Sequence, residues 1–126
     1  MKYAAAERYL LSRPEAVRDY PFGPDVAVFK ICGKMFATLA AQDGVARTNL
    51  KCDPVEAVML RDIFSGVQPG YHMNKRHWNT VILNGSVPRG EIERMIDNSY
   101  ALVVRGLKRS ERLGLELRHG REALYR

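Results

Sequence analysis

The sequence is short of the residues from which the simplest functional sites are built. It contains two cysteines and three histidines, and Cys32 and Cys52 lie too far apart for a CxxC redox or zinc motif. We expect both cysteines to be small buried apolar residues in a reducing compartment. GxSxG, Walker and GxGxxG motifs are also absent, so the sequence gives no signal for the common hydrolase and nucleotide-binding sites.

Long apolar runs are absent as well. No stretch approaches the roughly 18 apolar residues that a membrane span needs. Glu7 and Arg8 interrupt the region that a signal peptide would occupy. We therefore expect a cytoplasmic protein without membrane contact. A length of 126 residues predicts one domain, and we favour a monomer.

Acidic residues are the scarcer charged class, with 14 Asp and Glu against 20 Lys and Arg and a net charge of +6. The excess is uneven, because residues 105–126 carry +4 and residues 1–104 carry only +2. A basic excess favours polyanionic partners, since bound cations displace the counterions of phosphates. A modest +6 is equally typical of a soluble charged surface, so the charge alone does not select a partner.

Apolar periodicity predicts strands in the first half of the chain. Residues 26–31, 35–41 and 45–51 are rich in β-forming residues, and Gly33-Lys34 and Asp43-Gly44 should turn them into tight hairpins. Tight hairpins make a sheet antiparallel. A further strand is expected at residues 78–83.

Helical spacing predicts helices at residues 2–12 and 89–105 and a third that begins at Asp53 and ends at Gly66. Asp53 should cap this third helix. Its buried face is expected to consist of five apolar residues, Val55, Val58, Met59, Ile63 and Phe64.

The order of elements is helix, three strands, helix, one or two strands, helix. It predicts a two-layer α+β domain in which an antiparallel sheet carries helices on one face. We assign this single domain to residues 1–107. Residues 108–126 are expected to be a basic C-terminal extension, with a short helix followed by a loose tail.

The strand at residues 45–51 has an informative alternation. Ala46, Thr48 and Leu50 should face the core, and Arg47, Asn49 and Lys51 should form a polar, basic stripe on the opposite side.

The stretch "PGYHMNKRHWNTV" at 69–81 concentrates two histidines, a Lys-Arg pair and the one tryptophan. If Trp78 is buried, Arg76 leans inward, and Lys75, His77 and Asn79 face out as phosphate-type donors. If the strand is reversed, Trp78 and Arg76 are exposed together, which suits stacking on single strands. A lone tryptophan is more often a core residue, which favours the first arrangement.

The blocks "YPFGPDV", "FKICGKMFATL", "NLKCDP", "PGYHMNKRHWNTV" and "SYALVV", in that order, resemble the MmcQ/YjbR family of small bacterial proteins. The similarity runs from Arg13 to about Leu107. It implies a compact α+β fold with an antiparallel sheet, similar to that of the CyaY proteins. It also implies DNA binding through a "double wing" arrangement. The positions that match the family's most distinctive block are His72, Asn74, Lys75, His77 and Trp78.

Metal binding and catalysis find little support. His72 and His77 are five residues apart, which places them on opposite faces of a strand, and no acidic residue or cysteine lies between them. A nucleophile pair of Cys52 or Cys32 with His77 stays open on sequence alone, although burial of Cys52 would make its thiol inert. We expect no metal, no cofactor and no enzymatic activity.

These observations predict a non-enzymatic DNA-binding protein. Its phosphate contacts are expected from Arg47, Asn49, Lys51, Lys75, Arg76 and His77. We expect His72, Asn74 and Trp78 to shape the loop or the rim of a ligand pocket. The alternative is a protein-interaction or small-ligand-binding module, in which residues 71–78 rim a pocket and the charge serves solubility. A structural corner, with Asn74 in a turn, fits the same residues.

Overall fold

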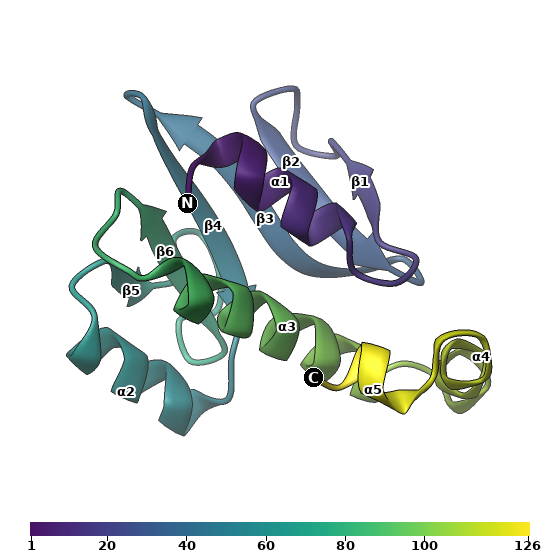
Figure 1. The fold of residues 1–126 in the computed structure, drawn as a ribbon. Helices are drawn as coiled ribbons and strands as arrows, with labels where there is room; N and C mark the ends of the chain where they lie inside the picture. Colours follow the sequence, from purple (N-terminus) through teal and green to yellow (C-terminus); the bar gives the residue numbers. More distant parts are fainter.

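The computed structural model describes all 126 residues and confirms the two-layer α+β architecture (Figure 1). One layer is an antiparallel sheet with the strand order β1-β2-β3-β4-β6-β5. The strands are β1 (Val17–Asp19), β2 (Val26–Ile31), β3 (Lys34–Gln42), β4 (Val45–Lys51), β5 (Val67–Pro69) and β6 (Trp78–Leu83). The helices are α1 (Tyr3–Leu11), α2 (Pro54–Ile63), α3 (Arg89–Arg105), α4 (Arg109–His119) and α5 (Arg121–Leu124), and none is long and apolar enough to cross a membrane.

The two hairpins form largely as predicted. Asp43 and Gly44 have φ values of 53° and 77°, so both turn residues lie in the left-handed region that a tight hairpin requires. In the first hairpin the turn is one residue earlier than expected, because Cys32 and Gly33 have positive φ and Lys34 already begins β3. Our prediction of a buried Cys32 was therefore wrong, since its place at the tip of the turn exposes it.

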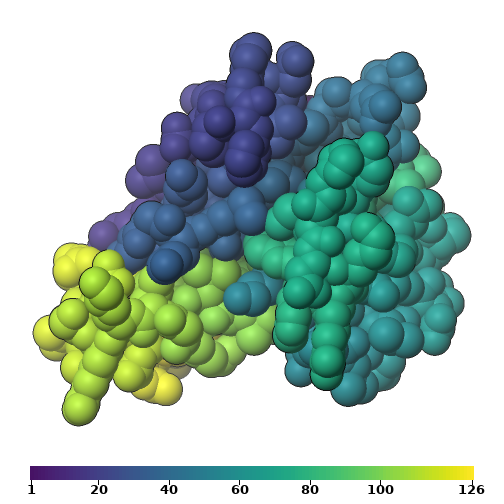
Figure 2. All heavy atoms as spheres, turned by 180° about the vertical axis from the view of Figure 1, so that it is seen from behind, coloured from purple at the N-terminus to yellow at the C-terminus, as the bar shows by residue number.

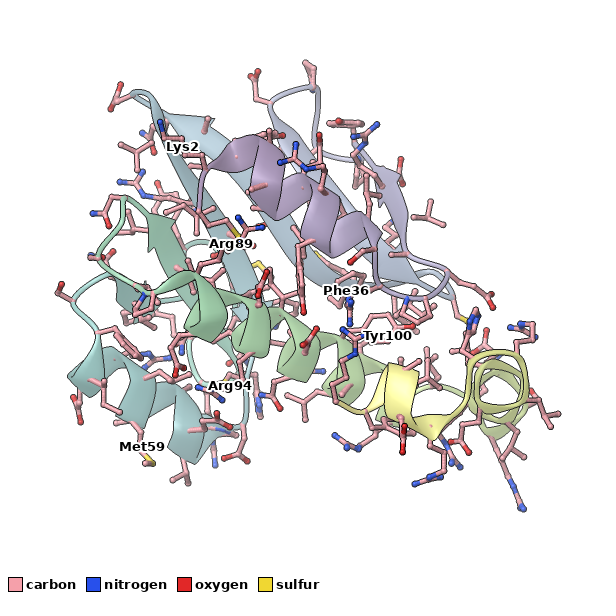
Figure 3. All side chains as sticks on the ribbon, in the orientation of Figure 1. Lys2, Phe36, Met59, Arg89, Arg94 and Tyr100 are labelled. Carbon is pink, nitrogen blue, oxygen red and sulfur yellow. The ribbon has the colours of Figure 1, made fainter.

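A β-bulge fixes α3 against the sheet. Phe29 pairs with Ala37 and Lys30 pairs with Met35, which leaves Phe36 as the extra residue. Phe36 is fully buried and meets the edge of the Tyr100 ring of α3, with centroids 5.2 Å apart (Figure 3). Ser99 donates a hydrogen bond to the Phe36 carbonyl (2.6 Å) and accepts one from the Lys51 amide (2.8 Å). One hydroxyl thus ties α3 to both β3 and β4.

The predicted buried face of α2 was wrong. Asp53 caps the helix as expected and accepts from the Val55 and Glu56 amides. The buried residues of the helix, however, are Ala57 and Leu60. Phe64 is only partly buried, and the exposed fractions of the other predicted core residues, Val55, Val58, Met59 and Ile63, run from 52% to 70%. Figure 3 shows Met59 pointing away from the rest of the molecule.

The C-terminal segment is not a loose tail. It forms α4 and α5, and Leu115 and Leu124 are buried in the same core as the sheet and α3. Arg118 and His119 contact the carboxylate of Glu15 at 2.7 and 2.6 Å. These contacts lower the pKa of Glu15, with the Arg118 hydrogen bond as the largest cause. Because the two leucines are nine residues apart and two glycines interrupt the segment, its packing left little periodic signal in the sequence.

A partly buried charge cluster joins the end of α1 to α3. Arg13, only 5% exposed, forms an ion pair with Asp97 at 2.9 Å, and the Tyr9 hydroxyl donates to the same carboxylate. Burial, reinforced by the bond to Asp97, raises the pKa of Tyr9. Tyr100 donates to the Pro14 carbonyl at 2.6 Å, so the turn after α1 is held from two sides.

Replacing Asp97 with Ala leaves Arg13 buried without its counter-ion, so Asp97→Ala should lower the free energy of unfolding by about 3 kcal/mol. Glu93→Ala is the matched control, because its ion pair with Arg89 on the same helix is more exposed. We expect the control to cost less than about 1 kcal/mol. Denaturant unfolding measures both losses, and equal losses would contradict the assigned role of Asp97.

Candidate binding face of the sheet

The predicted alternation of β4 is confirmed. Ala46, Thr48 and Leu50 are buried toward the helices, and the residues between them are only partly buried. Because paired residues of antiparallel strands share a face, the register places these residues beside residues of β6. Arg47 pairs with Ile82, Asn49 with Thr80, and Lys51 with Trp78. The stripe on β4 and the end of the 69–81 segment therefore lie next to each other on the face that no helix covers.

The side on which Trp78 lies differs from our prediction. Asn79, expected to face out, is 2% exposed on the helix side. It accepts a hydrogen bond from Arg61 Nε (2.7 Å) and donates to the Ala57 carbonyl (3.3 Å). Satisfied in this way, Asn79 is stable in the core, and alternation turns the half-buried Trp78 toward the open face. Arg76 is exposed instead of leaning inward.

The loop at residues 70–77 is built on local hydrogen bonds. The Asn74 side chain accepts from the Arg76 amide (3.0 Å), which confirms the expected turn. His72 has a φ of 57°, and its ring lies against that of Tyr71, with centroids 4.0 Å apart. Gly70 sits so close to Trp78 that an added Cβ would lie 2.8 Å from the Trp78 Cβ, which favours glycine here. The structural-corner interpretation of this segment is therefore correct as far as the backbone is concerned.

Arg61 of α2 holds this loop from the helix side. Its Nη2 donates to the Lys75 carbonyl and, at 3.5 Å, to the Trp78 carbonyl. Lys75 Nζ donates to the Gly70 carbonyl at 3.2 Å, so this lysine also closes the loop. In Figure 2 the loop, coloured teal-green, stands out from the face turned to the viewer. The donors of the loop and of β4 are thus presented on one side of the molecule.

The cations of this face have no carboxylate partner. None of the ion pairs in the molecule uses Arg47, Lys51, Lys75 or Arg76. In contrast, Arg112, Arg118 and Arg121 of the C-terminal helices are paired with Glu15 or Glu116. The cations of the sheet face therefore keep their full positive charge, whereas three of the seven cations in residues 105–126 are paired; the other four, Arg105, Lys108, Arg109 and Arg126, form no ion pair.

The same face contains a groove with a cavity volume of about 530 Å³. Its floor includes Thr38, Arg47, Asn49 and Thr80. Phe22, from the connection between β1 and β2, lines one part of the groove, and the 70–77 loop lines another with Tyr71, His72 and Met73. Sequence reasoning missed Phe22. Its signal was an aromatic residue, beside Tyr20, inside the proline-rich turn 19–26.

Metal binding and thiol chemistry both depend on where the His, Cys and acidic side chains lie. No group of three or more His, Cys, Asp and Glu side chains is placed to hold a metal ion. Cys52 and His77 meet through their backbones, since the Cys52 amide donates to the His77 carbonyl at 2.8 Å. Burial, with a smaller effect of Glu56, raises the pKa of the Cys52 thiol to about 11, so at neutral pH it is protonated.

Comparison with known proteins gives the family. The YjbR family model matches residues 11–102, which is well over half of the chain. The chain belongs to the YjbR family. Among relatives of this YjbR-family protein, the uncharacterised protein YbdF of Escherichia coli O157:H7 is 37% identical, over 86% of this chain and 89% of its own length. The uncharacterised protein YjbR of E. coli K12 is 31% identical, over 83% and 89% of the two chains.

Solved structures agree with this assignment. The crystal structure of Deinococcus radiodurans protein DR2400, with a DUF419 domain, is 33% identical with a TM-score of 0.81, over 90% of this chain and 87% of that one. The crystal structure of a Pseudomonas syringae protein is 32% identical with a TM-score of 0.72, over 81% and 98%. The helices α4 and α5 lie beyond the residues that the family model matches.

Arg61→Ala should loosen the 70–77 loop and leave the Asn79 side chain short of a buried donor. We expect a loss of about 2 kcal/mol in unfolding free energy and faster hydrogen exchange of the amides in residues 70–78. Arg89→Ala is the control, because Arg89 makes only an exposed ion pair. If the loop amides exchange equally slowly in both variants, Arg61 does not hold the loop.

The two thiols should react very differently with a maleimide at neutral pH. Cys32 is exposed and should be modified in the folded protein. Cys52 is buried and protonated, so we expect it to react only after unfolding. In the Cys32→Ser variant, Cys52 is the one remaining thiol, and mass spectrometry measures its labelling. Rapid labelling of this variant while it is folded would refute the burial of Cys52.

Proposed function

We propose that the open face of the sheet binds DNA through its phosphate backbone, without an enzymatic step. One observation carries this proposal. The strand register puts Arg47 and Lys51 on the helix-free face, the loop that contains Lys75 and Arg76 stands on the same face (Figure 2), and none of these cations has a carboxylate partner. Such cations are free to replace the counterions of phosphates, which is the main source of sequence-independent affinity.

Polar neighbours extend this surface. Asn49 lies between Arg47 and Lys51 on β4, and its Oδ1 accepts from the Thr80 hydroxyl, which leaves its amide nitrogen as a donor. His77 is half-buried beside Trp78 and stays a candidate contact. Asn74 and His72 act in this proposal by shaping the loop, whose backbone they define. The DNA binding that the resemblance to the MmcQ/YjbR family implies and the cytoplasmic location expected from the sequence are consistent with this role.

A second candidate function, small-ligand binding, is favoured by the groove. Its volume of about 530 Å³ lies in the range of ligand pockets, and it contains both apolar walls and polar groups. Phosphate binding uses the protruding cations, whereas ligand binding would use the floor between them. The two functions therefore make different demands on the same face and are tested separately.

Lys75→Ala combined with Arg76→Ala tests DNA binding. The affinity for a labelled duplex is measured across a salt series. The slope of log binding constant against log salt concentration should become shallower by about 0.9 for each phosphate contact removed, so by up to about 1.8 for the pair. Arg118→Ala with Arg121→Ala is the control, because it removes the same charge from the C-terminal helices, where both side chains are exposed. Near-ultraviolet circular dichroism should show that both variants are folded.

The proposal fails if the unmodified protein does not bind the duplex at low salt. It also fails if the two double variants lose the same slope, because binding would then follow the net charge of the protein and not the sheet face.

A further inference from the structure

The groove on the open face has a donor excess on its floor. Thr38 Oγ1 accepts from the Asn49 amide, and Thr80 Oγ1 accepts from the Tyr71 amide while it donates to Asn49 Oδ1. The Gln42 side-chain oxygen accepts from Arg47 Nη1 at 2.9 Å. The oxygens of the floor are therefore used by the protein itself.

Besides the Thr38 hydroxyl, the side-chain donors that remain on the floor are N–H groups. No hydrogen bond within the protein uses Nε or Nη2 of Arg47, the side-chain nitrogen of Asn49 or that of Gln42. All of these are N–H groups, and the guanidinium carries a full positive charge. A ligand that matches this floor must supply acceptors, and a carboxylate or phosphate oxygen pair suits the planar Arg47 fork best.

The walls require an apolar body on the same ligand. Phe22 and Tyr71 line the groove with exposed fractions of 71% and 66%, and Met35 and Met73 add flexible thioether surface. The His72 ring lies against the Tyr71 ring, with centroids 4.0 Å apart. Aromatic rings and methionines are efficient contacts for a flat apolar group, and covering them removes exposed apolar area from water.

The charges around the groove are mixed but favour an anion near Arg47. Asp25 is the one carboxylate among the lining residues, and it belongs to the connection between β1 and β2 together with Phe22. Arg47 lies on β4, beside Asn49 and Gln42. An anionic group directed at Arg47 therefore places its apolar body between the two lining loops.

We propose that this groove binds a small amphiphilic anion, in which a flat apolar body carries one carboxylate or phosphate that Arg47 receives. The site does not depend on DNA binding. It shares only Arg47 and Asn49 with the proposed phosphate surface, and its ligand is a small molecule.

Titration with 1-naphthoate, followed by two-dimensional amide NMR, tests the site with a ligand of this class. Saturable shifts should appear in residues of β4, the 20–25 connection and the 70–77 loop. The neutral analogue 1-naphthalenemethanol should bind at least about tenfold more weakly, because a charge-assisted bidentate contact is missing. 1-Naphthyl phosphate in a third titration shows whether the site prefers a phosphate to a carboxylate.

Arg47→Gln should weaken naphthoate binding about tenfold or more, and Phe22→Ala should weaken both naphthoate and its neutral analogue. Lys51→Gln is the matched control, since it removes a charge from the same strand and face but does not line the groove. Its affinity for naphthoate should be unchanged.

Three results would overturn the proposal. They are equal affinity for the acid and the alcohol, equal losses in Arg47→Gln and Lys51→Gln, and shifts confined to the exposed apolar face of α2. If the two sites are separate, the Lys75→Ala, Arg76→Ala double variant should lose duplex binding and still bind naphthoate. Failure of either proposal is thus visible without the other.

Discussion

The contact between Arg61 and Asn79 decides how this fold presents its open face. Asn79 carries an amide that the core tolerates only because the Arg61 guanidinium and the Ala57 carbonyl satisfy it. Asn79 is fixed beneath α2. Because side chains alternate along β6, Trp78 and Thr80 must then face the opposite side of the sheet. The same guanidinium binds the carbonyls of Lys75 and Trp78, so the helix also sets where the loop rises from the sheet.

The sequence was sufficient to predict the architecture and the polarity of β4. In that strand the alternating residues differ clearly, because Ala46 and Leu50 are apolar and Arg47 and Lys51 are charged. The strand β6 offers no such contrast, since each of its two faces combines apolar and polar residues. The choice between them depends on an arginine 18 residues earlier in the chain, which no local pattern records.

The helix α2 was misread for a related reason. Its large apolar residues suggested a core face, but it approaches the sheet through the small Ala57 and through Leu60, and Arg61 needs the adjoining space. The net charge of a segment was also a poor guide to the position of the candidate binding face. The C-terminal residues carry most of the basic excess, yet three of their arginines are paired with Glu15 or Glu116. The four cations of the sheet face, Arg47, Lys51, Lys75 and Arg76, come from the part of the chain that is nearly neutral as a whole.

The two outermost strands give the sheet a further property. β1 and β5 have three residues each, and β5 ends in Pro69, which has no amide hydrogen to offer. An incoming strand from another molecule would find too few free backbone groups at either margin to form a stable ladder. The sheet can therefore leave one broad face bare of helices while its short margins limit edge-to-edge pairing with another sheet.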